Sequence, residues 1–303
     1  MSKKSLKFLY VTDLHGNEEK YLNILGIAKD KGVSLIINGG DLFPYRDQEN
    51  FITGFLEDYF TSLFEAGIQY VCQLGNDDLQ IHDELFNNLC SSYSNVHNIA
   101  QRKVEVAGYE FVGMNYVLDY PFRLKDRCRK DDKDFVQERQ FGTALFSTGN
   151  SNKDIIEIQN WTKDLGKEIE GYRELSRKEY KKYLDSVPTI AEELRKLPKP
   201  ANKDKCIYII HQPPSRLGLD VCMDGRKVGS DALLQFLCDN PCFCSLHGHI
   251  HESPYMSREW GALLTNGAVA VQPGQYNELS YVIVEPEKKK FTKYPTKVKN
   301  YYY

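Results

Sequence analysis

The stretch KFLYVTDLHGN, residues 7–17, decides the fold class. Its apolar first half, KFLYVT, is typical of a buried strand, and Asp13 and His15 follow that strand directly. After this stretch we predict a helix over 18–31, a strand over 33–39, a helix over 50–66 and a strand over 69–74. This βαβαβ alternation predicts a parallel sheet with helices on both of its faces, with ligands at the carboxyl ends of its strands.

The chain returns to strand patterns twice more. Short strands are expected in NVHNIA (95–100) and in the pair within 103–114. After a long interruption, KCIYII (205–210) predicts another strand, followed by a helix over 230–240, the strand of FCSLHG (243–248), strands within 263–274 and 279–285, and a final hairpin or edge strand in KKKFTKYPTK (288–297). Two strand-rich segments that flank one interruption favour a single domain over residues 1–303.

The interruption, about 118–204, has a different character. It is dense in charge, its strand signals vanish, and polar helices are predicted over 166–184 and 189–197. We interpret it as a charged helical insertion or cap. The alternative is a solvated surface elaboration, the usual fate of a charge-rich stretch.

Bulk properties limit the class of protein. The 303 residues are 41% hydrophobic and 27% charged, as expected of a folded protein in water. The net charge of −3 gives no strong signal for nucleic acid or for a membrane surface, and the N-terminal apolar run is too short for a secretion signal. Eight scattered cysteines fit buried thiols in a reducing cytoplasm, although the CxxxCxC at 238–244 could bind zinc. We therefore expect a cytoplasmic protein, whose oligomeric state the sequence leaves open.

Polar residues of the ligand type follow five of the predicted strands. Because the carboxyl ends of parallel strands meet at one edge of a sheet, these residues are expected to converge there. They are Asp13, His15, Asp41, Asn76, His211, His249 and His251. The set offers only oxygen and nitrogen, which suits Mn²⁺, Fe²⁺, Zn²⁺ or Ni²⁺. Seven ligands suit two ions about 3.5–4 Å apart that share a carboxylate, either Asp41 or Asp13.

Five sequence blocks resemble one known family. TDLHG, GGDLF, GNDD, HQPP and GHIH, in that order over residues 12–251, resemble the calcineurin-like metallophosphoesterase superfamily, and VGSDALLQFL with LHGHIHES resembles its small prokaryotic single-domain branch. The resemblance implies an α/β fold, a four-layer α/β/β/α sandwich with a helical insertion. It implies two divalent ions, Mn²⁺ as the first expectation and Fe, Zn or Ni as alternatives, and a metal-bound hydroxide that attacks phosphorus in line.

The resemblance also implies a division of the ligands. One ion would be held by Asp13, His15, Asp41 and His251, and the other by Asp41, Asn76, His211 and His249, with Asp41 as the bridge. His247 matches no block and is interpreted as a packed imidazole that supports the ligands.

One position departs from the family pattern. The family usually has a histidine after the asparagine of the third block, where it helps to protonate the leaving oxygen, but this chain has Asp77, followed by Asp78. At the ordinary aspartate pKa of about 3.9 Asp77 would be ionised at pH 7. Either burial and Asp78 raise its pKa so that it serves as general acid, or it points elsewhere. In the second case the best substrates need little protonation of the leaving group.

Contacts with substrate are expected from fewer residues. The resemblance suggests Asn17, and Arg216 follows the His211 block closely enough to reach a phosphate. Arg123 and Arg127 of the insertion are further candidates, although such residues more often lie on the solvated surface.

These observations predict a metal-dependent phosphohydrolase that acts on a small phosphorylated substrate, a phosphodiester or a nucleotide anhydride. A phosphomonoesterase or protein phosphatase is the alternative of the same class. A binding module that has lost turnover is favoured only by Asp77, and a DNA nuclease is disfavoured by the neutral charge balance.

Overall fold

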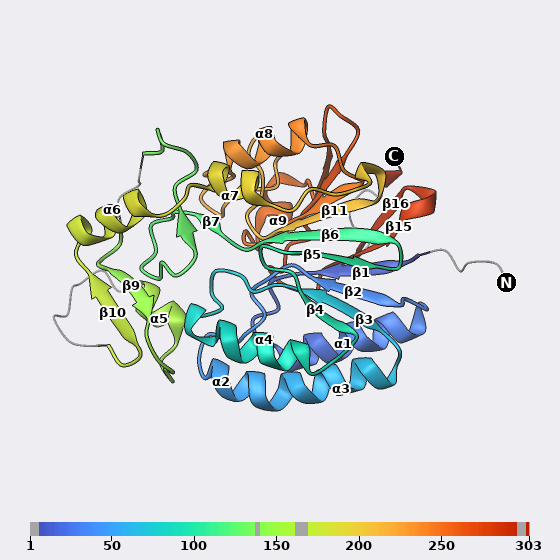
Figure 1. The fold of residues 1–303 in the computed structure, drawn as a ribbon, viewed down its shortest axis with the longest axis horizontal. Helices are drawn as coiled ribbons and strands as arrows, with labels where there is room; N and C mark the ends of the chain where they lie inside the picture. Colours follow the sequence, from blue (N-terminus) through green and yellow to red (C-terminus); the bar gives the residue numbers. More distant parts are fainter. Residues whose placement is uncertain (1–5, 137–139, 161–168, 296–300, 303) are drawn as a thin grey trace.

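The computed structural model describes residues 6–136, 140–160, 169–295 and 301–302. Two large sheets are stacked between two layers of helices (Figure 1). The first sheet contains, in sheet order, β17 (Tyr301–Tyr302), β16 (Lys290–Tyr294), β15 (Tyr281–Glu285), β1 (Phe8–Val11), β2 (Leu35–Asn38), β3 (Gln69–Cys72) and β4 (Val96–Asn98). The second contains β13 (Gly261–Leu263), β14 (Val269–Val271), β12 (Cys244–Leu246), β11 (Cys206–Ile210), β6 (Tyr109–Met114) and β5 (Lys103–Val106). The α/β/β/α order predicted from the sequence is confirmed.

The central strands of both sheets run parallel. β1, β2, β3 and β4 pair in parallel, and so do β6, β11, β12 and β14. β1, β2 and β11 are buried along their whole length, which is why they read as continuous apolar runs. The carboxyl ends of β1, β2 and β3 therefore share one edge of the first sheet, and those of β11 and β12 share one edge of the second.

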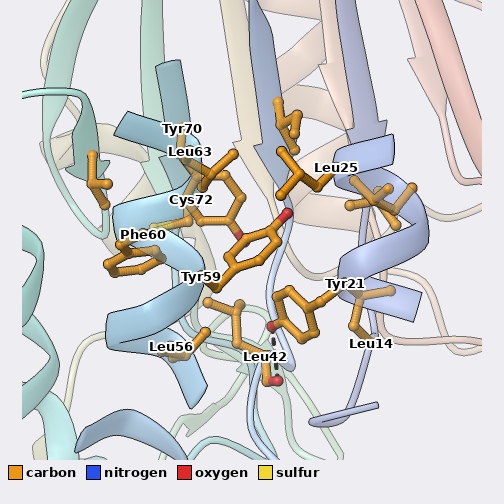
Figure 2. Close-up of a cluster of buried hydrophobic side chains, with 14 of the residues drawn as sticks. Leu14, Tyr21, Leu25, Leu42, Leu56, Tyr59, Phe60, Leu63, Tyr70 and Cys72 are labelled. Atoms are coloured by element: carbon orange, nitrogen blue, oxygen red, sulfur yellow. Dashed lines mark hydrogen bonds between the residues drawn. The ribbon is translucent and has the colours of Figure 1, made fainter. Parts of the chain in front are cut away.

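Aromatic residues pack the helices onto the outer face of the first sheet. This layer consists of α1 (Glu18–Asp30), α2 (Gln48–Phe51), which continues through the π-helix η1 (Ile52–Leu56) into α3 (Glu57–Glu65), and α4 (Asp83–Ser91). Figure 2 shows Tyr21 and Tyr59 packed together against β3, and the Tyr21 hydroxyl donates to the Leu42 carbonyl at 2.9 Å. The helix predicted over 50–66 is present but begins two residues earlier, at Gln48.

The inner faces of the two sheets form a second apolar layer. The first sheet contributes Phe8, Tyr10, Leu35, Ile37 and Val71, and the second contributes Phe111, Ile207, Ile209, Leu246 and Val271. Burial of apolar residues from two distant parts of the chain in one cluster explains why the sheets fold as one body.

Two helices cover the outer face of the second sheet. α7 (Ile190–Lys196) and α8 (Asp231–Asp239) pack through Leu194 and Leu233 against Tyr208 of β11. The helix predicted over 189–197 is confirmed, and its start is fixed by a capping box between Thr189 and Glu192. The last part of the predicted insertion therefore packs with this helix layer.

The rest of the insertion lies at one end of the sandwich, opposite the end where β1 begins (Figure 1). It contains β7 (Val117–Leu118), β8 (Cys128–Arg129), β9 (Ala144–Ser147), α5 (Ile155–Asn160), β10 (Tyr172–Leu175) and α6 (Arg177–Ser186). The prediction that this segment has no strands is wrong, because β9 and β10 form an antiparallel pair. The helix predicted over 166–184 is also wrong in its first half: 166–168 lie outside the described residues, 172–175 is a strand, and the helix starts after Ser176, whose side chain caps it.

Two sequence expectations concern bulk properties. Of the eight cysteines, all free, six are buried, and Cys222 and Cys238 are half-buried, in line with the thiol interpretation. In the part of the chain that the structure describes, every helix is too short or too polar to span a membrane.

Candidate metal centre

The polar residues that follow the strands lie together in two overlapping groups. Ligand atoms of Asp13, His15, Asp41 and His251 all lie within 4.8 Å of one another, and the same holds for Asp41, His211 and His249. Asn76 joins the second group, since its Oδ1 is 3.1 Å from Nε2 of His211. The structure thus brings all seven sequence-predicted residues to one place, with Asp41 in both groups.

The arrangement of these atoms fits bound cations. Nε2 of His15 and Nε2 of His251 are 2.9 Å apart, and Nε2 of His211 lies 3.1 Å from Oδ2 of Asp41. Among the described residues, the buried Oδ2 of Asp13 has no hydrogen-bond partner. A buried carboxylate oxygen without a partner is costly, and lone pairs that converge on one point are satisfied by a cation.

The loops after the strands hold an unusual backbone. Asp13, His15, Asp41 and His249 have positive φ angles of 56°, 44°, 51° and 72°. Such a conformation costs a non-glycine residue about 1 kcal/mol or more, and it clusters at functional sites. Hydrogen bonds from Asp13 N to Gly40 O and from His15 N to Asp41 O, both 2.9 Å, hold these turns in place. The sharp turns direct the ligand side chains to one centre.

Two glycines of the sequence blocks, Gly75 and Gly248, leave space beside the carboxylates of Asp41 and Asp13. A Cβ on Gly248 would lie 2.8 Å from Oδ2 of Asp13, and a Cβ on Gly75 would collide with the carboxylate of Asp41. Only glycine therefore lets these two loops approach the carboxylates.

The electrostatics prepare the histidines for metal binding. Burial, together with neighbouring imidazoles, lowers the pKa of both His15 and His249 to about 3. Burial would also lower the pKa of His211, but the carboxylate of Asp41 outweighs it and raises that pKa to about 9. Burial would raise the pKa of Asp41, yet the charge and hydrogen bond of His211 hold it well below its ordinary value. A cation can replace the His211 proton beside this carboxylate.

A cavity of about 660 Å³ opens beside the centre. Asp41, Asn76, His249 and His251 form part of its lining, and the insertion contributes Leu118 to Phe122, Phe135, Val136 and Ile156. Another side is formed by 222–224 and 226–229. Four of its lining residues, Phe122, Val136, Ile156 and Met223, are large hydrophobic residues that are exposed. Exposed apolar side chains that gather in one cavity indicate a binding surface for an organic group.

Asp77 and Asp78 have different environments. Asp77 lines the cavity, its N–H donates to Oδ1 of Asp41 at 2.8 Å, and its Oδ1 accepts from Nδ2 of Asn76 at 3.0 Å. Asp78 is fully buried and accepts N–H groups of Leu42, Phe43 and Gly75. Burial and the charge of Asp41 raise the pKa of Asp78 to about 7. Asp78 thus ties the loops after β2 and β3 together, and the role of Asp77 as an acid stays a prediction.

The two residues predicted to contact substrate, Asn17 and Arg216, are not among the described residues that line the cavity. Asn17 is exposed and caps α1, accepting the Lys20 N–H at 3.0 Å through its side-chain oxygen. Arg216 forms an exposed ion pair with Asp231 at 3.0 Å and is outside the cavity lining found among the described residues. Contact of either residue with substrate stays a prediction. The cavity is also lined by Tyr45, Tyr120 and Lys227, which no sequence motif singled out.

The surface interpretation of Arg123 and Arg127 is wrong. Both are buried, and Arg127 donates from Nε to the Gly75 carbonyl at 2.9 Å and pairs with Asp83 at 2.5 Å. Arg127 therefore braces the loop that carries Asn76, which no local sequence signal indicated, because its partners come from a distant segment.

His247 agrees with its sequence interpretation. It is fully buried, its Nδ1 lies 2.9 Å from the Ile210 carbonyl, and its Nε2 lies 2.9 Å from Oγ of Ser245. With partners on both ring nitrogens, it is a packed imidazole beside the ligand loop.

The chain is similar to known proteins in sequence family and in fold. The sequence profile of calcineurin-like phosphoesterases matches residues 6–253. No curated protein sequence is significantly similar to this chain. One crystal structure matches with a TM-score of 0.59 and 14% identity over 97% of this chain and 100% of its own. The crystal structure of TT1561 of Thermus thermophilus matches with a TM-score of 0.54 and 14% identity over 96% of this chain and 98% of its own. At these identities the two likenesses show the fold.

Proposed function

This chain belongs to the calcineurin-like phosphoesterase family, and we propose that it is a dinuclear metal-dependent hydrolase of phosphodiesters or nucleotide anhydrides. The observation that carries the proposal is the pair of ligand groups that share Asp41. Two sites joined by one carboxylate are the arrangement that clamps a phosphoryl centre from both sides.

We assign the ligands as the sequence suggested. Asp13, His15, Asp41 and His251 would hold one ion, and Asp41, Asn76, His211 and His249 the other. Mn²⁺ is the first expectation, and Fe, Zn and Ni suit the same oxygen and nitrogen donors. When bound, the ions would supply Lewis-acid stabilisation of phosphoryl charge and an activated water.

The chain's own residues support a substrate with an organic group on the phosphate. The cavity of about 660 Å³ is much larger than a phosphate needs, and the insertion gives it an apolar side. Lys227 lies in the same lining and offers a cation for the negative charge of the substrate.

Asp77 supports an easily released leaving group. It places a carboxylate at the cavity beside Asn76, where the family pattern has the histidine that helps to protonate the leaving oxygen. Phenolate or phosphate leaving groups need little protonation, so diesters with such groups and nucleotide anhydrides are the expected substrates.

The test compares two substrates on the purified, Mn²⁺-loaded protein. We expect kcat/KM for a phenolic phosphodiester to exceed that for an alkyl phosphomonoester by at least about tenfold, and a chelator to abolish both activities. A preference for the alkyl monoester would contradict the diester assignment. Two bound ions per chain without turnover of any phosphoester would favour the binding module that Asp77 leaves open.

A further inference from the structure

We propose that Tyr120 of the insertion is a catalytic residue, whose hydroxyl donates a hydrogen bond to an oxygen of the phosphoryl group in the cavity. The inference rests on the proposed function. It concerns a residue outside the seven ligands and outside the strand-end loops that carry them.

Tyr120 reaches the centre through Asn76. Nδ2 of Asn76 donates to the Tyr120 hydroxyl at 3.3 Å, while Oδ1 of the same amide lies 3.1 Å from Nε2 of His211. The Tyr120 ring centroid is 5.6 Å from that of His249, and the side chain lines the cavity. Tyr120 thus lies beside Asn76 and His249, at the group that also contains Asp41 and His211.

The Tyr120 hydroxyl accepts one hydrogen bond, which leaves its proton available for a second one. It accepts from Asn76, because an amide nitrogen can only donate, and within the described parts of the chain Asn76 is its only hydrogen-bond partner. The neighbouring Asp77 presents carboxylate oxygens, which accept. Tyr120 is therefore a neutral donor beside the place where negative charge develops during phosphoryl transfer.

The insertion fixes this donor in advance. Nζ of Lys125 donates to the backbone carbonyl of Tyr120 and to Oδ1 of Asp119 at 2.8 Å, and it lies 5.0 Å from the centre of the Tyr120 ring. Asp119 and Lys125 are both buried. The Tyr180 hydroxyl donates to the same oxygen of Asp119 at 2.7 Å. A donor stabilises a transition state best when its position is set before the reaction.

Tyr120→Phe tests the hydroxyl alone, because the ring and its contact with Lys125 remain. On the Mn²⁺-loaded protein we expect kcat for a phenolic phosphodiester to fall by about 10²-fold, with KM changed by less than about threefold. Orthovanadate, which mimics the five-coordinate transition state, should bind the variant about 10²-fold more weakly, as measured by calorimetry. Metal content should stay at the wild-type value, and Tyr255→Phe, an exposed tyrosine outside the cavity lining, should leave all of these quantities unchanged.

Three results would overturn the inference. The first is wild-type kcat and vanadate affinity in Tyr120→Phe. The second is a loss of metal from this variant, because the hydroxyl would then act only by orienting Asn76. The third is a rise in KM with kcat unchanged, which indicates ground-state binding alone. If the wild-type protein turns over no phosphoester, the proposed function fails separately, and the vanadate comparison still decides the hydrogen bond.

Discussion

The carboxylate of Asp41 contacts residues of both candidate ligand groups. Its Oδ2 faces His211 at 3.1 Å and His15 at 3.9 Å, while its Oδ1 accepts the Asp77 N–H. The positive φ of Asp41 lets it follow β2 and still turn its carboxylate back to the centre.

Asp41→Asn removes one of these oxygens and replaces it with an amide that cannot bridge two ions. We expect fewer than two ions per chain by elemental analysis and a fall in diester hydrolysis of more than about 100-fold. Asp58→Asn, an exposed position on α3, serves as the control. Full metal content in Asp41→Asn would count against the bridging assignment.

Asp77→His would place a donor where this chain has a carboxylate. Since an imidazolium can protonate an alkoxide leaving group, hydrolysis of an alkyl phosphomonoester should rise by about 10²-fold relative to a phenolic diester. The ratio of the two kcat/KM values measures this effect. An unchanged ratio would show that the side chain at position 77 does not reach the leaving oxygen.

Single residues also show where sequence reasoning succeeds. The convergence of the seven proposed ligands could be predicted because each follows a strand, and parallel strands fix where their ends lie. Arg127 and Tyr120 could not, because their partners, Gly75 and Asn76, are brought to them by the path of the insertion. A charged or aromatic residue in a polar stretch carries no local sign of a distant partner.

The loop from β7 to β8 depends on a buried ion pair. Lys125 and Asp119 are both fully buried in their side chains, so neither charge has water as a substitute partner. Lys125→Met removes the buried cation that pairs with the Asp119 carboxylate and should reduce the free energy of unfolding by about 3 kcal/mol or more. Urea denaturation measures this, with Lys178→Met on the exposed side of α6 as the control. A loss below about 1 kcal/mol would mean that water or another cation reaches Asp119.

Glu110 of β6 fastens the end of the insertion to the second sheet. Its carboxylate accepts from Lys103 Nζ at 2.6 Å and from the backbone N–H groups of Ala201 and Asn202, and these contacts lower its pKa to about 2. Its folded pKa lies below its unfolded value, so the ionised group stabilises the protein above about pH 4.5, and this stability is lost as the pH falls toward 2.

Glu110→Gln should therefore cost about 1–2 kcal/mol at pH 7 and progressively less as the pH falls from about 5 to about 3. Urea denaturation across this pH range checks the trend. Glu65→Gln on α3 is the control, since Glu65 is exposed and lies on an element that does not pair with β6. A difference between Glu110→Gln and wild type that does not vary with pH would contradict the assignment of the stability to the ionised carboxylate.

Among the elements, long apolar strands were predictable and short polar ones were not. β1, β2 and β11 are buried on both faces, and such strands show in the sequence as unbroken apolar runs. β10 has one buried residue in four and stands among charges, so its pattern is that of a polar helix or loop. Tertiary pairing with β9, rather than local preference, makes it a strand.

The molecule as a whole joins two half-sheets from either side of the insertion. β6 precedes the insertion and β11 follows it, and the two pair in parallel along five residues. This pairing supports the single domain over 1–303 that we propose. It also brings His211 and His249 from the second sheet to Asp13 and Asp41 from the first.

Bound ions should therefore stabilise the whole fold. At an ion concentration about 100 times the dissociation constant, the gain is about 2.7 kcal/mol, which corresponds to several degrees in Tm. We expect a chelator to lower Tm by about 5 °C and added Mn²⁺ to restore it, as followed by scanning calorimetry. A Tm that does not respond to either addition would indicate that the centre does not bind ions in the folded protein.

The left-handed turns at Asp13, His15, Asp41 and His249 lower the stability of the fold in exchange for placing metal-ligand side chains. Glycine would relax each of these turns, so random mutagenesis under heat in the presence of a chelator, where bound ions contribute no stability, should drift toward more stable variants that lack metal ligands. A selection for thermal stability in this fold must therefore also select for turnover. Otherwise substitutions will accumulate first in the loops that carry these four residues.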